Sequence, residues 1–249
     1  MPNRTSQPHA AADEHPLFIL EQVIAFLDHH GAPHWLDQGT LLGAVRDGAP
    51  IPWDEDLDIS TWADVMRPLL PTLKNTFSQA GCLIFYSPDQ IKITCRANGP
   101  LPVDMQLYHR VGHRAHASLR ASPAGRLRRK TYRKAKKIES ALVRARAERL
   151  QNNTARKEPQ AETPFFVDRL TDRVSLARDH LMRKIPIAVD ASFFEELHPI
   201  MLNGVAAKKP SAAEEYLSLK YGNDWRTPKR QWDYRVQDGA IAVPPSKGR

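Results

Sequence analysis

Three aspartates, Asp54, Asp56 and Asp58, alternate along the short run 53–59. In an extended segment successive side chains point to opposite faces, so the spacing predicts that the three carboxylates share one face. Clustered carboxylates repel one another, and this repulsion disfavours their ionised forms. Mg²⁺ or Mn²⁺ relieves the repulsion, because hard cations take oxygen ligands and a phosphate can complete their coordination. The pattern therefore predicts a divalent-metal site suited to phosphoryl or nucleotidyl transfer.

A further carboxylate is expected from another strand. Asp104 lies between Val103 and Met105, where an unpaired acid would be costly to bury. We therefore predict that Asp56, Asp58 and Asp104 form the catalytic, metal-binding set, with Asp54 as a flanking ligand. The competing interpretation is that the acid-rich segment is only a solvated loop.

Gly39 and Thr40 precede a helical pattern that begins at Leu41. A glycine turn before a helix N-terminus aims backbone N–H groups at an anion, so both residues are candidate ligands of a donor phosphate. Arg46, about two turns later, could bind the same phosphates bidentately, and Lys92 could neutralise them. Simpler alternatives are plain helix capping at Gly39-Thr40, a surface ion pair for Arg46 and a solvated edge position for Lys92.

The elements that must position these residues follow from hydrophobic periodicity. Helical spacing predicts helices and period-two alternation predicts strands, which together indicate an α+β fold with a small mixed sheet. The predicted helices are 16–30, 41–46, 61–80 (interrupted at Pro68 and Pro71) and 212–221, and the predicted strands are 34–36, 57–60, 82–86, 91–96 and 102–108.

Charge is concentrated in one segment of the 249-residue chain. Residues 110–157 hold 16 Lys and Arg against 2 Glu, which gives +14, whereas the whole chain carries +8. With this shift in composition, the expected organisation is a disordered leader (1–15), a catalytic core (16–109), a basic and helical insert (110–164), a C-terminal helical block (165–235) and a polar tail (236–249).

Three roles compete for the basic insert. A solvated, partly disordered insert is the simplest. Attraction of residues 120–149 to an anionic membrane surface or a phosphorylated glycolipid is the second, because each basic residue near such a surface contributes about 1 kcal/mol. Nucleic-acid binding is the least favoured, because aromatic residues are absent there apart from Tyr132.

The two cysteines, Cys82 and Cys95, could form one disulfide, but their number favours free thiols in a reducing compartment. The polar N-terminus lacks the apolar core of a signal peptide, and the apolar runs are too short to span a bilayer. We therefore expect a cytoplasmic protein that can associate peripherally with the inner face of the membrane.

Two motifs resemble the LicD/fukutin family of the nucleotidyltransferase superfamily. The first runs through residues 36–46 and 51–59, where Gly39-Thr40, Asp56-Leu57-Asp58 and the later Asp104 match the family's turn, acid-apolar-acid strand and third acid. The second is similar to the family's C-terminal block and comprises Tyr216-Leu217, Tyr221-Gly222, Trp225 and Pro228. We expect the second block to be mainly structural and to wall the site.

The resemblance implies a metal-dependent transferase with Mg²⁺ or Mn²⁺. It would move a phosphocholine- or polyol-phosphate-like group from a CDP-linked donor to the hydroxyl of a glycan or glycolipid. Two alternatives remain open. One is a nucleotidyltransferase that adds a nucleoside monophosphate to a small molecule or RNA, and the other is a nucleic-acid-binding protein that uses the basic insert.

Overall fold

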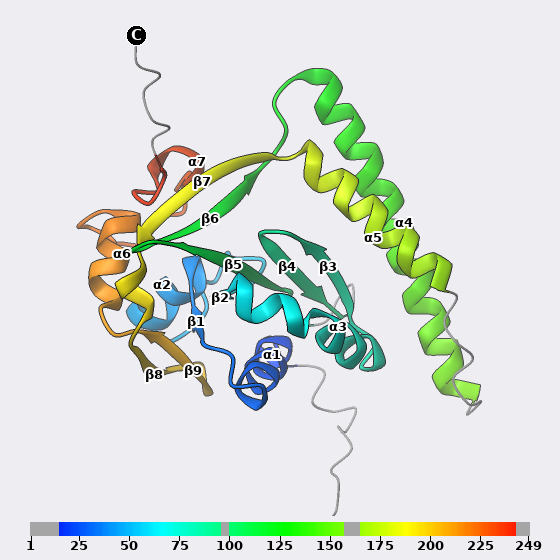
Figure 1. Ribbon diagram of the computed structural model, residues 1–249, viewed down its shortest axis with the longest axis horizontal. Helices are drawn as coiled ribbons and strands as arrows, with labels where there is room; N and C mark the ends of the chain where they lie inside the picture. Colours follow the sequence, from blue (N-terminus) through cyan, green and yellow to red (C-terminus); the bar gives the residue numbers. More distant parts are fainter. Residues whose placement is uncertain (1–14, 96–99, 157–164, 243–249) are drawn as a thin grey trace, which may run out of the picture.

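The structure is a computed structural model that describes residues 15–95, 100–156 and 165–242. Its centre is a seven-stranded mixed sheet, which confirms the predicted α+β class (Figure 1). The path β1-β2-β5-β4-β3 forms the main part, and β6 joins it to β7. The strands are β1 (His34–Leu36), β2 (Leu57–Trp62), β3 (Leu83–Ser87), β4 (Gln90–Thr94), β5 (Val103–Val111), β6 (Arg114–Ala121) and β7 (Arg183–Asp190).

The register of the central strands separates an apolar from a polar face. β2 runs parallel to β5, and β4 runs antiparallel to it, so that Ile59 pairs with Met105 and Met105 pairs with Ile91. These three side chains are fully buried. Because side chains alternate along each strand, the neighbouring residues form a polar row on the opposite face. The alternation thus sets the core on one side and the candidate site on the other.

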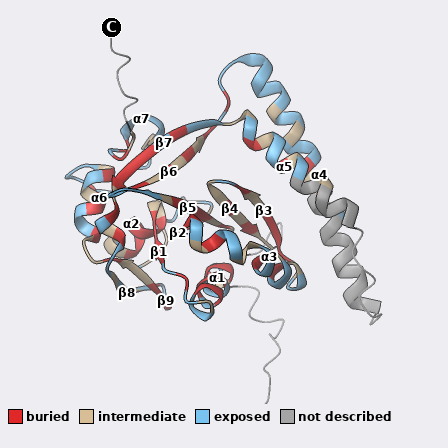
Figure 2. Cartoon of the chain, in the orientation of Figure 1, coloured by how far each residue is buried: buried red, intermediate tan, exposed pale blue. Residues whose placement is uncertain are grey.

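Helices from the N-terminal half complete the core. The three helices predicted there are α1 (Phe18–His29), α2 (Gln38–Arg46) and α3 (Ala63–Gln79), and α3 packs against β2, β3 and β5. Figure 2 shows the buried stripe of α1. The interruption predicted at Pro68 and Pro71 is absent, because α3 continues through both prolines.

The basic segment differs from the prediction at its beginning. Residues 114–121 form β6 rather than a helix, and small or apolar side chains alternate with Arg, His and Ser along it. The buried members are Ala115, Ala117, Leu119 and Ala121; alanine gives only a weak strand signal, so the charge count concealed this strand. The helix α4 (Arg126–Arg156) follows, and it packs beside α5 (Phe165–Leu181) in a pair that projects from the body (Figure 1).

The predicted C-terminal helical block begins with helix α5, but β structure follows it. After β7 come a 3₁₀ turn (Ala191–Phe194) and the hairpin β8 (Leu197–Leu202) and β9 (Val205–Pro210), which packs on β1 and α2. Beyond β7, the α-helices of the described residues are α6 (Ala213–Tyr221) and the short α7 (Tyr234–Gln237). The prediction of α6 is confirmed, and Gly222 ends it with φ +86°.

The first residues of the predicted polar tail belong to the fold. Asp238 is fully buried and forms an ion pair of 2.9 Å with the equally buried Lys220 of α6. The N–H of Ala188 in β7 donates to the carbonyl of Ala240, and Ile187 bridges to Ile241. The rest of the tail (243–249) and the predicted leader up to residue 14 lie outside the described residues.

The expectation of free thiols is wrong in this structure. Cys82 and Cys95 form a disulfide that joins the outer ends of the β3–β4 hairpin. The hairpin register brings them together, because Leu83 pairs with Thr94. Disulfides persist mainly in oxidising compartments, so the cysteines no longer support a reducing location.

Candidate active site

The core of the site is a row of three side chains on the polar face of the sheet. Asp58 of β2 pairs with Asp104 of β5, and Asp104 pairs with Lys92 of β4. Directly paired residues on neighbouring strands have side chains within contact range on the same face. The structure therefore brings Asp58 and Asp104 together, as the sequence predicted, and it adds Lys92 to the same row.

Lys92 lies among the carboxylates. Its Nζ donates to Oδ1 of Asp104 at 2.9 Å and lies 3.7 Å from Oδ2 of Asp56. Only about a third of the side chain is exposed. Lys92 is therefore not the solvated edge lysine that was the simpler alternative, because it pairs with Asp104 and Asp56.

Asp54 and Asp56 reach the site from a loop rather than from an extended strand. The chain bends through residues 52–56, and β2 begins only at Leu57. The Asp54 carboxylate lies over Gly39 so closely that a Cβ at that position would overlap Oδ2 of Asp54. The three aspartates therefore line one cavity, although strict strand alternation does not place them.

Burial and neighbouring charges shift the pKa values of the site residues. Burial, followed by the charges of Asp56 and Asp104, raises the pKa of Asp58 well above its ordinary value. Burial and Asp56 also raise the pKa of Asp54. For Asp104 burial outweighs the opposing effect of Lys92, and its pKa is raised. Burial disfavours the charge of Lys92, yet Asp104 and Asp56 outweigh it and raise the pKa of the lysine.

The donor set fits a hard divalent cation in its chemistry. It contains carboxylate oxygens alone, which Mg²⁺ and Mn²⁺ prefer, and it holds more negative charge than Lys92 can balance. Within the ranges that the structure describes, no group of three His, Cys, Asp or Glu side chains is already gathered closely enough to enclose an ion. Lys92, between Asp104 and Asp56, supplies the positive charge there instead.

Helix α2 holds the glycine turn in a different way from that predicted. The helix begins at Gln38, so Gly39 and Thr40 belong to its first turn, and Asp37 is the N-cap. Thr40 is buried, and its Oγ1 accepts the N–H of Asp58 at 2.7 Å. Thr40 thus fastens α2 to the strand that carries the acids. Gly39 lines the cavity, as does Arg46, which pairs with Asp47 at 2.7 Å.

A fully buried carboxylate, Asp37, was missed as an organising residue. Its oxygens accept hydrogen bonds from the Gln38 N–H, from Ser60 and from the hydroxyls of Tyr108 and Tyr216, all at 2.7–3.0 Å. The partners come from α2, β2, β5 and α6, so one side chain joins four elements beneath the site. Because Tyr108 and Tyr216 are remote in the sequence, local spacing could not reveal this cluster.

A cavity of about 690 Å³ opens above the acids. This volume lies within the roughly 300–1,000 Å³ typical of small-molecule sites. The C-terminal motif supplies an aromatic wall, with Tyr221 and Trp232 rings 4.5 Å apart and Arg230 placed 5.4 Å over Trp53. The residues that line the cavity on this side are Trp53, from the loop before β2, and Tyr221, Trp225, Thr227, Lys229, Arg230, Trp232 and Tyr234.

Comparison with known proteins relates one segment of the chain to a known family. Residues 31–87 match the nucleotidyltransferase domain of the LicD/FKTN/FKRP family. The chain is also 43% identical over 42 residues to ribitol 5-phosphate transferase FKRP of Mus musculus and to that of Homo sapiens. Each alignment covers 17% of this chain and 8% of the relative. The resemblance inferred from the motifs is therefore confirmed over the segment that contains Gly39 and Asp58.

Proposed function

Because residues 31–87 match the LicD/FKTN/FKRP nucleotidyltransferase domain, we propose that this chain is a metal-dependent transferase of phospho-alcohol groups. The donor is CDP-linked, the transferred group is phosphocholine- or polyol-phosphate-like, and the acceptor is the hydroxyl of a glycan. The observation that carries the proposal is the row Asp58–Asp104–Lys92, with Asp54 and Asp56 beside it, at the base of a cavity of about 690 Å³.

In this proposal Asp56, Asp58 and Asp104 hold Mg²⁺ or Mn²⁺, with Asp54 as a flanking ligand. When bound, such a cation neutralises phosphate charge and lowers the pKa of a hydroxyl. Burial and then the charges of Asp56 and Asp104 raise the pKa of Asp58, and a cation among these carboxylates would favour their charged forms.

The reaction would be a displacement at the β-phosphorus of the donor. The acceptor hydroxyl forms a new bond to that phosphorus, the bond to the oxygen of CMP breaks, and CMP leaves. Asp104 accepts the hydroxyl proton, and Lys92 keeps the Asp104 carboxylate oriented at 2.9 Å. Lys92 and Arg46 bind donor phosphate oxygens, while Gly39 leaves room for Asp54.

The aromatic wall is suited to the nucleoside of the donor. Stacking of a base on an aromatic side chain contributes about 1–3 kcal/mol. Trp53, Tyr221, Trp225 and Trp232 all line the cavity, and Arg230 lies on the Trp53 ring. We therefore assign the cytidine to this side of the cavity.

Helix α4 supports an anionic surface as partner. Its first turns, within residues 126–137, carry eight exposed Lys and Arg and no acid. No helix in the described ranges is long and apolar enough to cross a membrane. We propose that the exposed cations attract an anionic bilayer; co-sedimentation with phosphatidylserine vesicles should exceed that with phosphatidylcholine vesicles, and equal binding would contradict this role.

Two alternatives use the same features. A nucleotidyltransferase would attack the α-phosphorus of a nucleoside triphosphate and release pyrophosphate, so CTP turnover with pyrophosphate release would favour it. A nucleic-acid-binding protein would bind RNA through α4 in a salt-sensitive manner and would leave CDP-linked donors intact.

The deciding experiment follows CMP release from CDP-ribitol, with Mg²⁺ or Mn²⁺ and a polyol or glycan acceptor, by ³¹P NMR. Asp58→Asn should lower turnover by about 10³-fold or more, equivalent to roughly 4 kcal/mol of transition-state stabilisation. Asp64→Asn on the exposed side of α3 is the matched control and should leave turnover unchanged. Retained activity in Asp58→Asn would reject the proposed site.

A further inference from the structure

The cavity has a second end, formed by the helical pair α4–α5. Lys136 of α4 and Ser175, Arg178, Asp179 and Met182 on or just after α5 line it together with the acids of the sheet. These residues lie outside the segment 31–87 that matches the family domain. The helical pair α4–α5 therefore contributes its own surface to the cavity.

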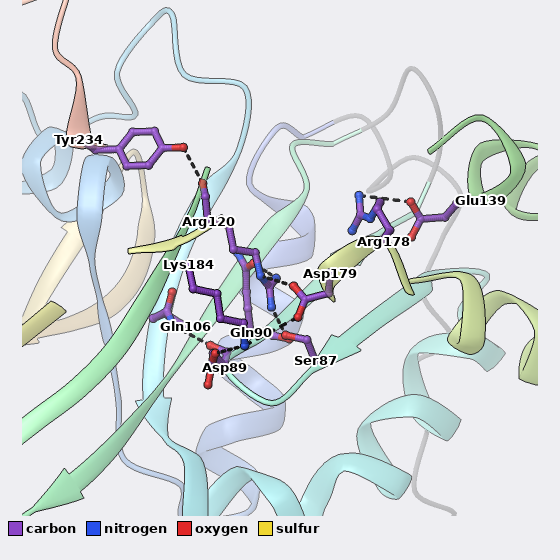
Figure 3. Close-up of polar contacts among 10 residues, drawn as sticks. All are labelled: Ser87, Asp89, Gln90, Gln106, Arg120, Glu139, Arg178, Asp179, Lys184 and Tyr234. Atoms are coloured by element: carbon purple, nitrogen blue, oxygen red, sulfur yellow. Dashed lines mark hydrogen bonds and ion pairs between the residues drawn. The ribbon is translucent and has the colours of Figure 1, made fainter. Parts of the chain in front are cut away.

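Arg120 of β6 joins helix α5 to the β3–β4 hairpin of the sheet (Figure 3). Its Nε pairs with Oδ1 of Asp179 at 2.7 Å, and its other nitrogens contact Gln90 and Ser87 at the turn of the β3–β4 hairpin. Burial lowers the pKa of Arg120, while the charges of Asp179 and Asp104 favour its charged form. Gln90, which Arg120 contacts, lies two residues before Lys92 on β4, so Arg120 links the helical pair to the strand that carries Lys92 beside Asp104.

The cations of the insert end are held in place differently. Arg178 is fixed by the buried Glu139, with Nη1 and Oε2 3.2 Å apart (Figure 3). Ser175 in turn donates a hydrogen bond of 2.6 Å to Glu139. Lys136 is exposed and forms no ion pair with the described residues. Among the charged groups that line this end, Arg120, Arg178 and Lys136 outnumber Asp179.

We propose that Lys136 and Arg178 form an anion subsite that binds a phosphate group of the acceptor. The acceptor of the transfer is therefore a phosphate-bearing polyol or glycan rather than a neutral one. The identification of the bound molecule as an acceptor rests on the proposed function. The anion subsite itself rests on Lys136, Arg178 and the cavity that they line.

Charge separation within the cavity assigns this subsite to the acceptor rather than to the donor. The donor phosphates are matched by Lys92, Arg46 and the cation that the acids would hold, all at the sheet end. A second anion is best matched by Lys136, which has no ion pair with the described residues, and by Arg178, whose guanidinium Glu139 holds in place. An acceptor held there by its phosphate can present a hydroxyl towards Asp104, because both groups line one cavity and Arg120 joins α5 to the hairpin that carries Lys92.

The test measures binding of glycerol 3-phosphate by isothermal titration calorimetry, with CDP and Mg²⁺ present to fill the donor end and glycerol as the uncharged comparison. Lys136→Glu should weaken glycerol 3-phosphate by about tenfold or more, as expected for loss of a charge-assisted contact. The matched control is Lys137→Glu, the neighbouring exposed lysine outside the cavity lining, which should leave the affinity unchanged. Arg178→Lys keeps the charge beside Glu139 but loses the planar fork, and it should weaken binding without unfolding the protein.

Wild-type affinity in both Lys136→Glu and Arg178→Lys, or equal binding of glycerol and glycerol 3-phosphate, would overturn the subsite. The proposed function has a separate readout, which is stabilisation by CDP-ribitol with Mg²⁺ in the same variants. If that stabilisation is absent while glycerol 3-phosphate still depends on Lys136, the donor assignment fails and the anion subsite stands.

Discussion

Asp58 and Lys92 show how single residues set the electrostatics of this site. Asp58 has its pKa raised well above the ordinary value by burial and by neighbouring acids, and Lys92 lies between Asp104 and Asp56. The lysine balances part of the negative charge, and the remainder favours a divalent cation. Both positions follow from strand register, which pairs each of these residues with Asp104.

Replacing Gly39 with Ala tests the close approach of α2 to Asp54. The new Cβ would overlap Oδ2 of Asp54, so the carboxylate must move away from the cavity. We expect turnover to fall about 10–100-fold, a loss typical of displaced metal-site support, while the melting temperature changes little.

A double-mutant cycle provides the control for this prediction. If Gly39→Ala acts through Asp54, it should have little further effect in an Asp54→Ala background. Additive losses from the two substitutions would show that Gly39 acts by another route, such as direct contact of its N–H with phosphate.

Replacing Tyr216 with Phe tests the buried Asp37 cluster. The substitution removes the hydroxyl that donates to Oδ1 of Asp37 at 2.9 Å. Hydrogen bonds to charged groups contribute about 1.5–3 kcal/mol, so urea unfolding should show a loss of that size. Tyr132→Phe on α4, where no hydrogen bond of the hydroxyl is recorded within the described ranges, should change stability far less, and equal losses would contradict the role of Tyr216.

At the residue scale the acids could be predicted from the sequence, whereas the hydrogen bonds that hold their strands and helices in place could not. Alternating aspartates and an isolated Asp104 among apolar neighbours are local signals, and the four acids that they single out line one cavity. Their role as metal ligands stays a prediction. The Asp37 cluster depends on Tyr216, which is 179 positions away in the chain, so only the folded structure reveals it. The hydrogen bond from Asp58 to Thr40 is hidden for the same reason.

At the scale of elements, the β3–β4 hairpin links the sheet to the site. β4 carries Lys92, and the turn of the hairpin contacts Arg120. The disulfide between Cys82 and Cys95 closes the open end of the hairpin across 13 positions of sequence. The hairpin is therefore held at both ends, by a covalent bond at one and by polar contacts at the other.

Reduction of this disulfide should destabilise the protein. A loop of this size predicts a loss of about 3 kcal/mol in the free energy of unfolding on the chain-entropy account. Urea unfolding with and without a phosphine reductant measures it, and the Cys82→Ser/Cys95→Ser double variant is the control that should not respond to the reductant. An unchanged unfolding midpoint after complete reduction of the wild type would contradict the prediction.

Elements with strong periodicity were predictable, and those defined by distant pairing were not. The helices α1, α3 and α6 and the strands β2 to β5 follow from apolar spacing. β6 alternates alanine with Arg and Ser, which is a weak strand pattern, and β7 follows a long helix. The local sequence of neither strand therefore predicts that the two pair. Their pairing over eight residues, from Arg114 with Asp190 to Ala121 with Arg183, depends on bringing the two ends of the basic helical pair together.

At the scale of the whole molecule, three parts of the chain enclose one cavity. The segment before β3 supplies Asp54, Asp56 and Asp58, and β5 supplies Asp104. The helical pair α4–α5 supplies Lys136 and Arg178, and the C-terminal region supplies most of the aromatic wall. The predicted walling role of the C-terminal motif is consistent with Tyr221, Trp225 and Trp232 in the lining. Under the proposed function, the donor nucleoside, the transferred phosphate and the acceptor would occupy separate parts of this cavity of about 690 Å³.

The central claim is that the acids bind a CDP-linked donor together with a divalent cation. The most direct measurement is the thermal stability of wild type and Asp58→Asn with CDP-ribitol, with and without Mg²⁺ or Mn²⁺. The account predicts stabilisation of the wild type that needs both the metal and the CDP donor, of about 2.7 kcal/mol at a hundredfold excess over Kd, and no such stabilisation in Asp58→Asn. Equal stabilisation of the two proteins, or stabilisation that is independent of the metal, would contradict it.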